Sequence, residues 1–403
     1  MEQQLVRTSA IVATPAARTL PNIWALPDLL ARDWAYAATS QRDLRIDLLR
    51  GFAVFAMVAN HFGGASWLYL ITGGDTFMVS AAEAFIFISG VTVGIVYGAL
   101  ALKEGLRAAQ VKAFRRALTL YKLTVVLTLL FAAVSLLFKL PWSSGIQIDN
   151  PLVFVFNVVT MRQTMYLTDI PLMYTFLMLA APFGLWLLVK GRTHVLLAVS
   201  GALWLAFQIF PAAIQVPWPI VGNTTFNLAA WQLLFFCAMA IGFHRDELAR
   251  KFGALPRVPY MVFMGVLLAW LIQANATYSS ILTRLVPGLD TTPLTSELFL
   301  KSALGPGRLI ASAILFQFAF FAVTILWKPI AAAFGWLLLP LGQSALYGYT
   351  LHVVIIGLFY EVLPYLPGNV TAMGTLNTAL QLSVILAIWV MIQRRFLFAV
   401  VPR

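Results

Sequence analysis

The sequence predicts an all-α polytopic membrane protein, a transmembrane helical bundle of about ten spans with both termini in the cytoplasm. Of its 403 residues, 61% are hydrophobic and only 10% are charged, and the mean hydropathy is +0.86. Soluble domains carry about a quarter charged residues, so this composition suits lipid rather than water as the solvent. A membrane β-barrel would show alternating segments of about ten residues. The long unbroken apolar runs therefore favour helices.

The apolar runs set the number of spans, because a helix needs about 20 apolar residues to cross a bilayer. A further apolar stretch, 149–160, is too short to cross, and we expect an interfacial or re-entrant segment there. The expected spans are 46–68, 77–100, 114–138, 167–189, 194–211, 227–244, 258–276, 307–328, 341–363 and 375–393.

Basic residues are divided unequally between the two sides of this bundle. With ten spans, the side that holds both termini carries 21 Lys and Arg residues, whereas the other carries only five: Lys139, Arg162, Arg284, Lys301 and Arg308. Basic residues concentrate in cytoplasmic loops, so both termini are predicted to be cytoplasmic. The same rule accounts for the net charge of +12. We therefore expect no nucleic-acid partner.

Three segments are expected along the chain. Residues 1–40 form a cytoplasmic tail, partly disordered or lying on the membrane surface around Trp24 and Trp34. Residues 41–395 form the membrane domain, and 396–403 form a short cytoplasmic tail. The one cysteine, Cys237, excludes a disulfide within the chain and a cysteine-based metal site, and no metal site is expected.

The first span holds a candidate catalytic pair, Arg50 and His61. Eleven residues correspond to three helical turns plus about 20°, so both side chains project from one face, about 16 Å apart along the axis. Histidine can act as a base and arginine as a permanent cation for a carboxylate or phosphate. The alternative is a helix-end arginine that marks the cytoplasmic side and a histidine hydrogen-bonded between helices.

The second span contains Glu83, a third candidate catalytic residue. A carboxylate within a span must be protonated, paired or exposed to water, and Arg50 and His61 are its candidate partners. Gly90, Gly94 and Gly98 follow at four-residue spacing, a pattern that lets another helix approach closely.

Basic residues continue into the third span as Arg115, Arg116 and Lys122. Arg115 and Lys122 are seven residues apart and lie within about 20° of one helix face. Such a stripe suits an anionic cofactor or co-substrate, because Arg and Lys both bind phosphates. Alternatively, the arginines are ordinary flanking charges and Lys122 extends its ammonium to the membrane surface.

Other polar residues within or beside the spans are candidates for substrate binding. Each alone could be an interhelical hydrogen bond, but together they indicate a polar interior that both sides of the membrane can reach. These residues are Asp169, Asn227, Trp231, Gln232, Arg308, Tyr349 and His352.

Several of these segments together resemble the OpgC family, the succinyl-modifying proteins of osmoregulated periplasmic glucans, distant kin of the wider acyltransferase-3 membrane proteins. The resemblance covers residues 41–395, nearly the whole chain. The segments that carry it are RIDLLRG (45–51) with His61, AAEAFIFISG (81–90), LTDIPLMY (167–174), NLAAWQLLFF (227–236) and LGQSALYGYTLH (341–352).

The resemblance implies an acyltransferase of the bacterial cytoplasmic membrane. It would take an acyl group, succinyl above all, from cytoplasmic acyl-CoA and place it on a hydroxyl of an extracytoplasmic glycan. Arg50 and His61 match the Arg-x10-His motif of the wider family, whereas its cytoplasmic Arg-x-x-Arg motif is matched only loosely by Arg115, Arg116 and Lys122. Acyl-CoA is thus the expected co-substrate, with no permanently bound cofactor. A proton-coupled transporter or flippase, or a membrane scaffold, remains the alternative.

Overall fold

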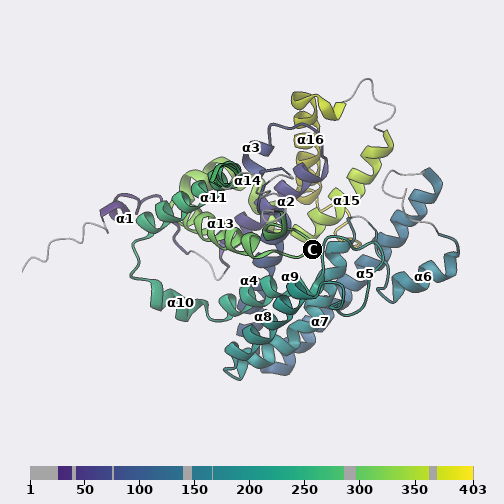
Figure 1. Ribbon diagram of the computed structural model, residues 1–403, viewed down its shortest axis with the longest axis horizontal. Coiled ribbons are helices and arrows are strands. Elements are labelled where there is room, and N and C mark those ends of the chain that lie inside the picture. Colours follow the sequence, from purple (N-terminus) through teal and green to yellow (C-terminus); the bar gives the residue numbers. More distant parts are fainter. Residues whose placement is uncertain are drawn as a thin grey trace, which may run out of the picture.

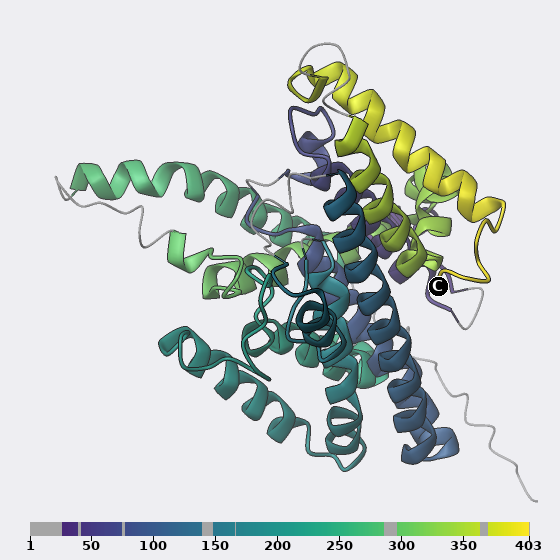
Figure 2. The same cartoon turned by 90° about the vertical axis from the view of Figure 1, so that its right-hand side faces the viewer.

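The computed structural model describes residues 26–38, 42–74, 77–138, 148–165, 167–285, 296–362 and 370–402, with the backbone alone for 274–285 and 360–362. This part of the chain is all-helical, and its one β-like contact is an isolated bridge between Gln163 and Val221. Figures 1 and 2 show the arrangement of the helices. They are α1 (Leu26–Leu30), α2 (Leu44–His61), α3 (Tyr69–Thr72), α4 (Ala81–Glu104), α5 (Leu106–Phe138), α6 (Pro151–Val159), α7 (Asp169–Val189), α8 (Thr193–Ile209), α9 (Leu228–Phe243), α10 (Arg245–Phe252), α11 (Arg257–Leu285), α13 (Pro306–Ile325), α14 (Trp327–Gln343), α15 (Ala345–Val362), the short 3-10 helix η4 (Val370–Ala372) and α16 (Gly374–Gln393).

Helix α2 lies at the centre of the bundle (Figure 1) and packs most extensively against α14. The two backbones touch where Gly51 of α2 meets Gly342 of α14. A Cβ atom on Gly51 would overlap the carbonyl oxygen of Leu338, and one on Gly342 would overlap that of Asp47. Small residues permit this close approach, which brings both backbones into direct van der Waals contact.

A second close crossing joins α4 and α9. Cβ atoms on Gly90 and Gly94 would overlap carbonyl oxygens of Phe235 and Met239, and Gly242 faces the carbonyl of Val91 in the same way. The prediction that the glycine repeat of the second span admits another helix is therefore confirmed. Helix α4 also packs against α2.

The helices identify a multi-pass membrane protein. Among the described residues, five helices are long and apolar enough to cross a bilayer: α4, α5, α7, α13 and α16. Two further spans result if the pairs α9–α10 and α14–α15, bent by 73° and 89°, each count as one. Helix α2 carries three charges among its first seven residues, and α8 has only 17 residues. The expectation of ten spans with cytoplasmic termini thus stays a prediction.

One element differs from the sequence pattern. Helix α14 was not expected, because Pro329 and Pro340 interrupt its sequence, and the predicted ninth span begins inside it. Pro329 is tolerated because the first turn of a helix needs no N–H donor there. The apolar stretch 149–160 forms α6, whose first turn is capped by the Asn150 side chain.

The crossing of α2 and α14 predicts a sharp effect of a single methyl group. Gly342→Ala is expected to destabilise the protein by about 1–3 kcal/mol, because backbone atoms cannot move aside as a flexible side chain can. Thermal unfolding of the detergent-solubilised protein measures this. The matched control is Gly201→Ala in α8, where no atom lies within 4 Å of the added Cβ. Equal unfolding temperatures for the two variants would contradict the crossing.

Candidate functional site

His61 and His352 form a directly bonded pair. His61 is the last residue of α2, and His352 lies in α15. His61 Nδ1 and His352 Nε2 are 2.9 Å apart, and the rings stack at 5.2 Å with an interplanar angle of 27°. His352 is fully buried, whereas His61 is partly exposed. The contact requires one proton between the two nitrogens, which leaves Nε2 of His61 as the nitrogen able to act on another group.

Tyr349 lies one helical turn before His352, and its ring meets the His352 ring edge-on at 4.9 Å. Its hydroxyl donates a hydrogen bond of 2.5 Å to the carbonyl oxygen of Leu167, just before α7. Tyr349 therefore ties α15 to the start of α7 and forms a wall beside the histidine pair.

On the other side of Tyr349 is a cavity of about 330 Å³ between α2, α4, α5, α7, α14 and α15. Three cations line it, and its lining contains no carboxylate. The remaining lining is largely apolar or aromatic. The lining residues are Arg50, Phe85, Ser89, Thr92, Val93, Val96, Tyr97, Lys112, Arg116, Leu120, Ile170, Pro171, Tyr174, Met178, Gly342, Gln343, Ala345, Leu346 and Tyr349.

The cavity has a basic end and an apolar end. Helices α4 and α5 fold back on each other at Gly105, so Tyr97 and Lys112 meet at one end, with the ammonium 5.7 Å from the ring centroid. Arg116 follows one turn farther along α5. Phe85, Ile170 and Tyr349 lie at the opposite end. An anionic group is thus favoured at one end and a neutral chain at the other.

Arg50 lies between these ends. Its guanidinium donates to Thr92 Oγ1, and Asp47 Oδ1 is 3.6 Å away. Asp47 is shared with Arg42, which contacts it at 2.5 and 2.9 Å. Arg50 is thus part of the cavity wall, and its predicted catalytic role stays a prediction.

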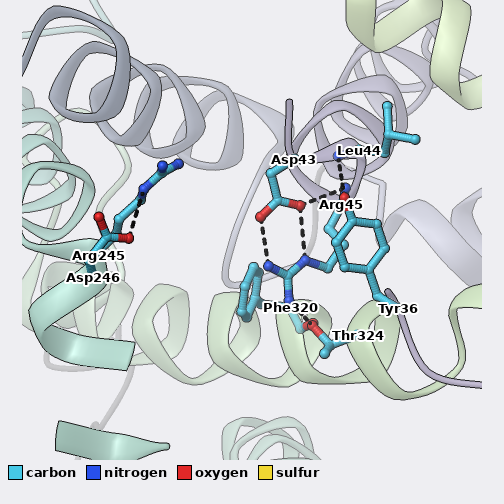
Figure 3. A network of polar contacts seen from close by, with 8 residues as sticks. All are labelled: Tyr36, Asp43, Leu44, Arg45, Arg245, Asp246, Phe320 and Thr324. Carbon is cyan, nitrogen blue, oxygen red and sulfur yellow. Dashed lines mark hydrogen bonds and ion pairs between the residues drawn. The ribbon is translucent and has the colours of Figure 1, made fainter. Parts of the chain in front are cut away.

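The other basic residue at the start of α2, Arg45, is held away from the cavity. Figure 3 shows its guanidinium bonded to Asp43 (2.6 and 2.9 Å) and Thr324 (3.0 Å). The rings of Tyr36 and Phe320 lie 4.6 and 4.5 Å from it. Asp43 also caps α2. This network anchors the beginning of α2 on α13.

The three residues predicted to bind the cofactor are separated by the structure. Arg116 lines the cavity, but Arg115 and Lys122 are exposed on the outer face of α5. Lys112, one turn before Arg116, lines the cavity instead and was not among the candidates. The signal that could have found it is the four-residue spacing of 112, 116 and 120, which share one helix face.

Glu83 is bonded to Arg308. In the part of the chain that the structure describes, no hydrogen bond or ion pair joins Glu83 to its predicted partners, Arg50 and His61. Arg308 Nε donates to Glu83 Oε1, and the Ser80 backbone N–H donates to Oε2 at 2.9 Å. The side chains are 0% and 7% exposed. The pair joins the beginnings of α4 and α13. The predicted catalytic role of Glu83 and substrate role of Arg308 are not tested by this geometry.

Four other candidate substrate residues occupy structural positions outside the cavity lining. Asn227 caps α9 by accepting from the Ala229 N–H at 2.9 Å, and Gln232 bonds Ser200 of α8. Trp231 is fully buried against Phe226. Asp169, the first residue of α7, is buried. It lies two residues after Leu167, whose carbonyl accepts the hydrogen bond from Tyr349. Their roles in substrate binding stay predictions.

In the described part of the chain, no three His, Cys, Asp or Glu side chains come together as a metal site requires. A family model described as "OpgC protein" matches residues 42–396, nearly the whole chain. Searches of curated proteins and of solved structures found no match.

The buried pair Glu83–Arg308 predicts a large loss of stability when its charge balance is broken. Glu83→Gln leaves a buried guanidinium without its counter-charge, which costs about 3–5 kcal/mol. Thermal unfolding in detergent measures the loss. Asp246→Asn is the matched control, because it removes the carboxylate of the exposed ion pair Arg245–Asp246, which is also drawn in Figure 3. The side chains of that pair are 48% and 81% exposed, and such surface pairs contribute little to stability.

The double variant Glu83→Gln/Arg308→Gln should recover part of that loss, because it removes the uncompensated charge. Equal unfolding temperatures for Glu83→Gln and Asp246→Asn would show that the buried pair does not carry this stability.

Proposed function

The chain belongs to the OpgC family, which indicates a glucan-modifying acyltransferase, and from this premise we propose that it moves a succinyl group from succinyl-CoA to a hydroxyl of a periplasmic glucan. The protein would act in the bacterial inner membrane, as a ten-span bundle with both termini cytoplasmic. The observation that carries the proposal is the cavity that is basic at one end and closed at the other by Tyr349, behind which lies the bonded pair His352–His61.

The cavity suits a long amphipathic donor. In the proposed complex, Lys112 and Arg116 bind phosphates of the coenzyme at the basic end, and its pantetheine arm lies along the apolar walls. Arg50 lies farther in, between Thr92 and Asp47, and can hold the free carboxylate of the succinyl group. Charge-assisted hydrogen bonds of this kind are the strong ones in a site of low dielectric.

The histidine pair supplies the base. In the proposed mechanism the His61 Nδ1–H donates a hydrogen bond to His352 Nε2, so His61 Nε2 carries no proton. It removes the proton of the sugar hydroxyl as the oxygen attacks the thioester carbonyl. The C–S bond breaks, and the leaving thiolate takes the proton from His61. Arg50 and Glu83 have assisting roles in this proposal. Arg50 acts from the cavity wall, and Glu83 acts indirectly, by holding Arg308.

Neither histidine lines the cavity, so transfer also requires a passage beside Tyr349. The Tyr349 hydroxyl bond to Leu167 holds the partition in place. In the proposed mechanism, movement of the Tyr349 side chain joins the cavity to His61. A closed partition in the resting state would keep water from the thioester.

His61→Ala is expected to reduce glycan acylation at least about 100-fold in cells, since general base catalysis contributes about that much. Mass spectrometry of the extracted glycans measures it. His352→Gln, which can still accept from His61, should retain more activity than His352→Ala. His194→Ala is the control, because His194 is an exposed residue of α8. Unchanged acylation in His61→Ala at normal protein levels would remove His61 from the mechanism.

A binding experiment separates the cavity from the outer face of α5. Lys112→Gln/Arg116→Gln should weaken coenzyme A binding about 150-fold or more, because each of the two charge-assisted contacts contributes about 1.5–3 kcal/mol. Arg115→Gln/Lys122→Gln removes the same charge from the same helix and should leave the affinity unchanged. Isothermal titration of the purified protein measures both. A greater loss in the Arg115/Lys122 variant would place the coenzyme outside the cavity.

The alternative function, proton-coupled transport, makes a different prediction for purified protein in liposomes. Turnover of labelled succinyl-CoA supports the acyltransferase. Flux of an anion or glycan precursor without acyl transfer would support the transporter instead.

A further inference from the structure

A second basic site lies on the outer face of α5, opposite the cavity. Arg107 and Arg115 border a shallow groove of about 470 Å³, whose remaining lining is Gln110, Val111, Phe114 and Pro182 of α7. The groove floor is fixed, because the Gln110 amide donates to the Pro182 carbonyl at 3.1 Å. This contact ties α5 to α7 at Pro182.

Both arginines are exposed and lack a counter-charge. Within the described ranges, no ion pair involves Arg107 or Arg115, and no carboxylate lines the groove. Lys112 and Arg116 of the same helix have different surroundings, because they line the cavity. The two guanidinium groups are therefore available to an anion that approaches from outside the bundle.

The length of α5 places the groove at the membrane surface. Its 33 residues extend about 50 Å, whereas the hydrocarbon core is about 30 Å thick. The apolar part of α5 follows residue 116, so the first ten residues lie beyond the core, in the layer of lipid headgroups. Figure 2 shows α5 running through most of the height of the molecule.

Apolar surface continues from the groove toward the membrane interior. Phe114 and Val111 are exposed within it, and Leu118 of α5 and Leu179 and Phe183 of α7 are exposed beside it. A molecule seated here would place an anionic head against the arginines and a hydrocarbon chain along these side chains. A soluble anion would use only the first of these two surfaces.

We propose that Arg107 and Arg115, with Phe114 and Pro182 between them, form a specific binding site for the phosphate headgroup of an anionic phospholipid. The lipid's acyl chain lies along the exposed side chains of α5 and α7. This site is separate from the proposed acyl transfer, and it would also clamp α5 to α7 next to the cavity.

Native mass spectrometry of the full-length protein tests the site with three probes: phosphatidylglycerol, phosphatidylcholine with the same acyl chains, and glycerol 1-phosphate. Phosphatidylglycerol should bind more tightly than phosphatidylcholine. Arg107→Gln/Arg115→Gln should weaken that binding about 25-fold, because each basic residue near an anionic lipid contributes about a factor of five.

Two further variants control for charge and folding. Arg250→Gln/Arg394→Gln removes the same charge from two exposed arginines elsewhere and should bind phosphatidylglycerol as the unaltered protein does. Arg107→Lys/Arg115→Lys keeps the charge and should retain most of the affinity. Equal binding of the two lipids, an equal loss in the Arg250/Arg394 variant, or displacement of the lipid by equimolar glycerol 1-phosphate would overturn the proposal.

Discussion

The backbone contact between α2 and α14 is the constraint on which the site depends. Gly51 and Gly342 allow the two helices to touch, and a side chain at either position would push them apart. This crossing fixes the height and rotation of α2. Arg50, one residue before Gly51, consequently enters the cavity wall, and His61, at the end of the same helix, meets α15. The 89° bend between α14 and α15 then directs Tyr349 and His352 toward α2.

The cost of burying charge in a membrane protein explains how the remaining ionisable groups are arranged. Glu83 is matched by Arg308, Arg45 by Asp43, and Asp47 by Arg42 and Arg50. These pairs join α4 to α13 and hold the beginning of α2. The cavity brings three cations, Arg50, Lys112 and Arg116, beside largely apolar walls, and no carboxylate is among its lining residues. Several cations at one end of an apolar chamber suit an elongated anion with a neutral chain.

The sequence predicted the helical class, the membrane location and the family, because composition, apolar run length and local motifs are properties of the chain alone. Among the candidate site residues, Arg50, Arg116 and Tyr349 line the cavity, and His61 and His352 form a bonded pair outside its lining, while their functional roles stay predictions. It did not identify the contact between those histidines, since no local pattern links residues 291 positions apart. Lys112 was missed, although its four-residue spacing to Arg116 and Leu120 places these residues on one helix face. Helix α14 was not predicted, because its sequence contains two prolines. The partners proposed for Glu83 did not include Arg308, which lies 225 residues away in the sequence.

The most direct test of the account is a density map of the protein with bound coenzyme A. The account predicts the nucleotide phosphates at Lys112 and Arg116 and the thiol end beside Tyr349, on the side of that residue opposite His61. Density for the coenzyme on the outer face of α5, at Arg115 and Lys122, or at any place that leaves the cavity empty, would contradict it.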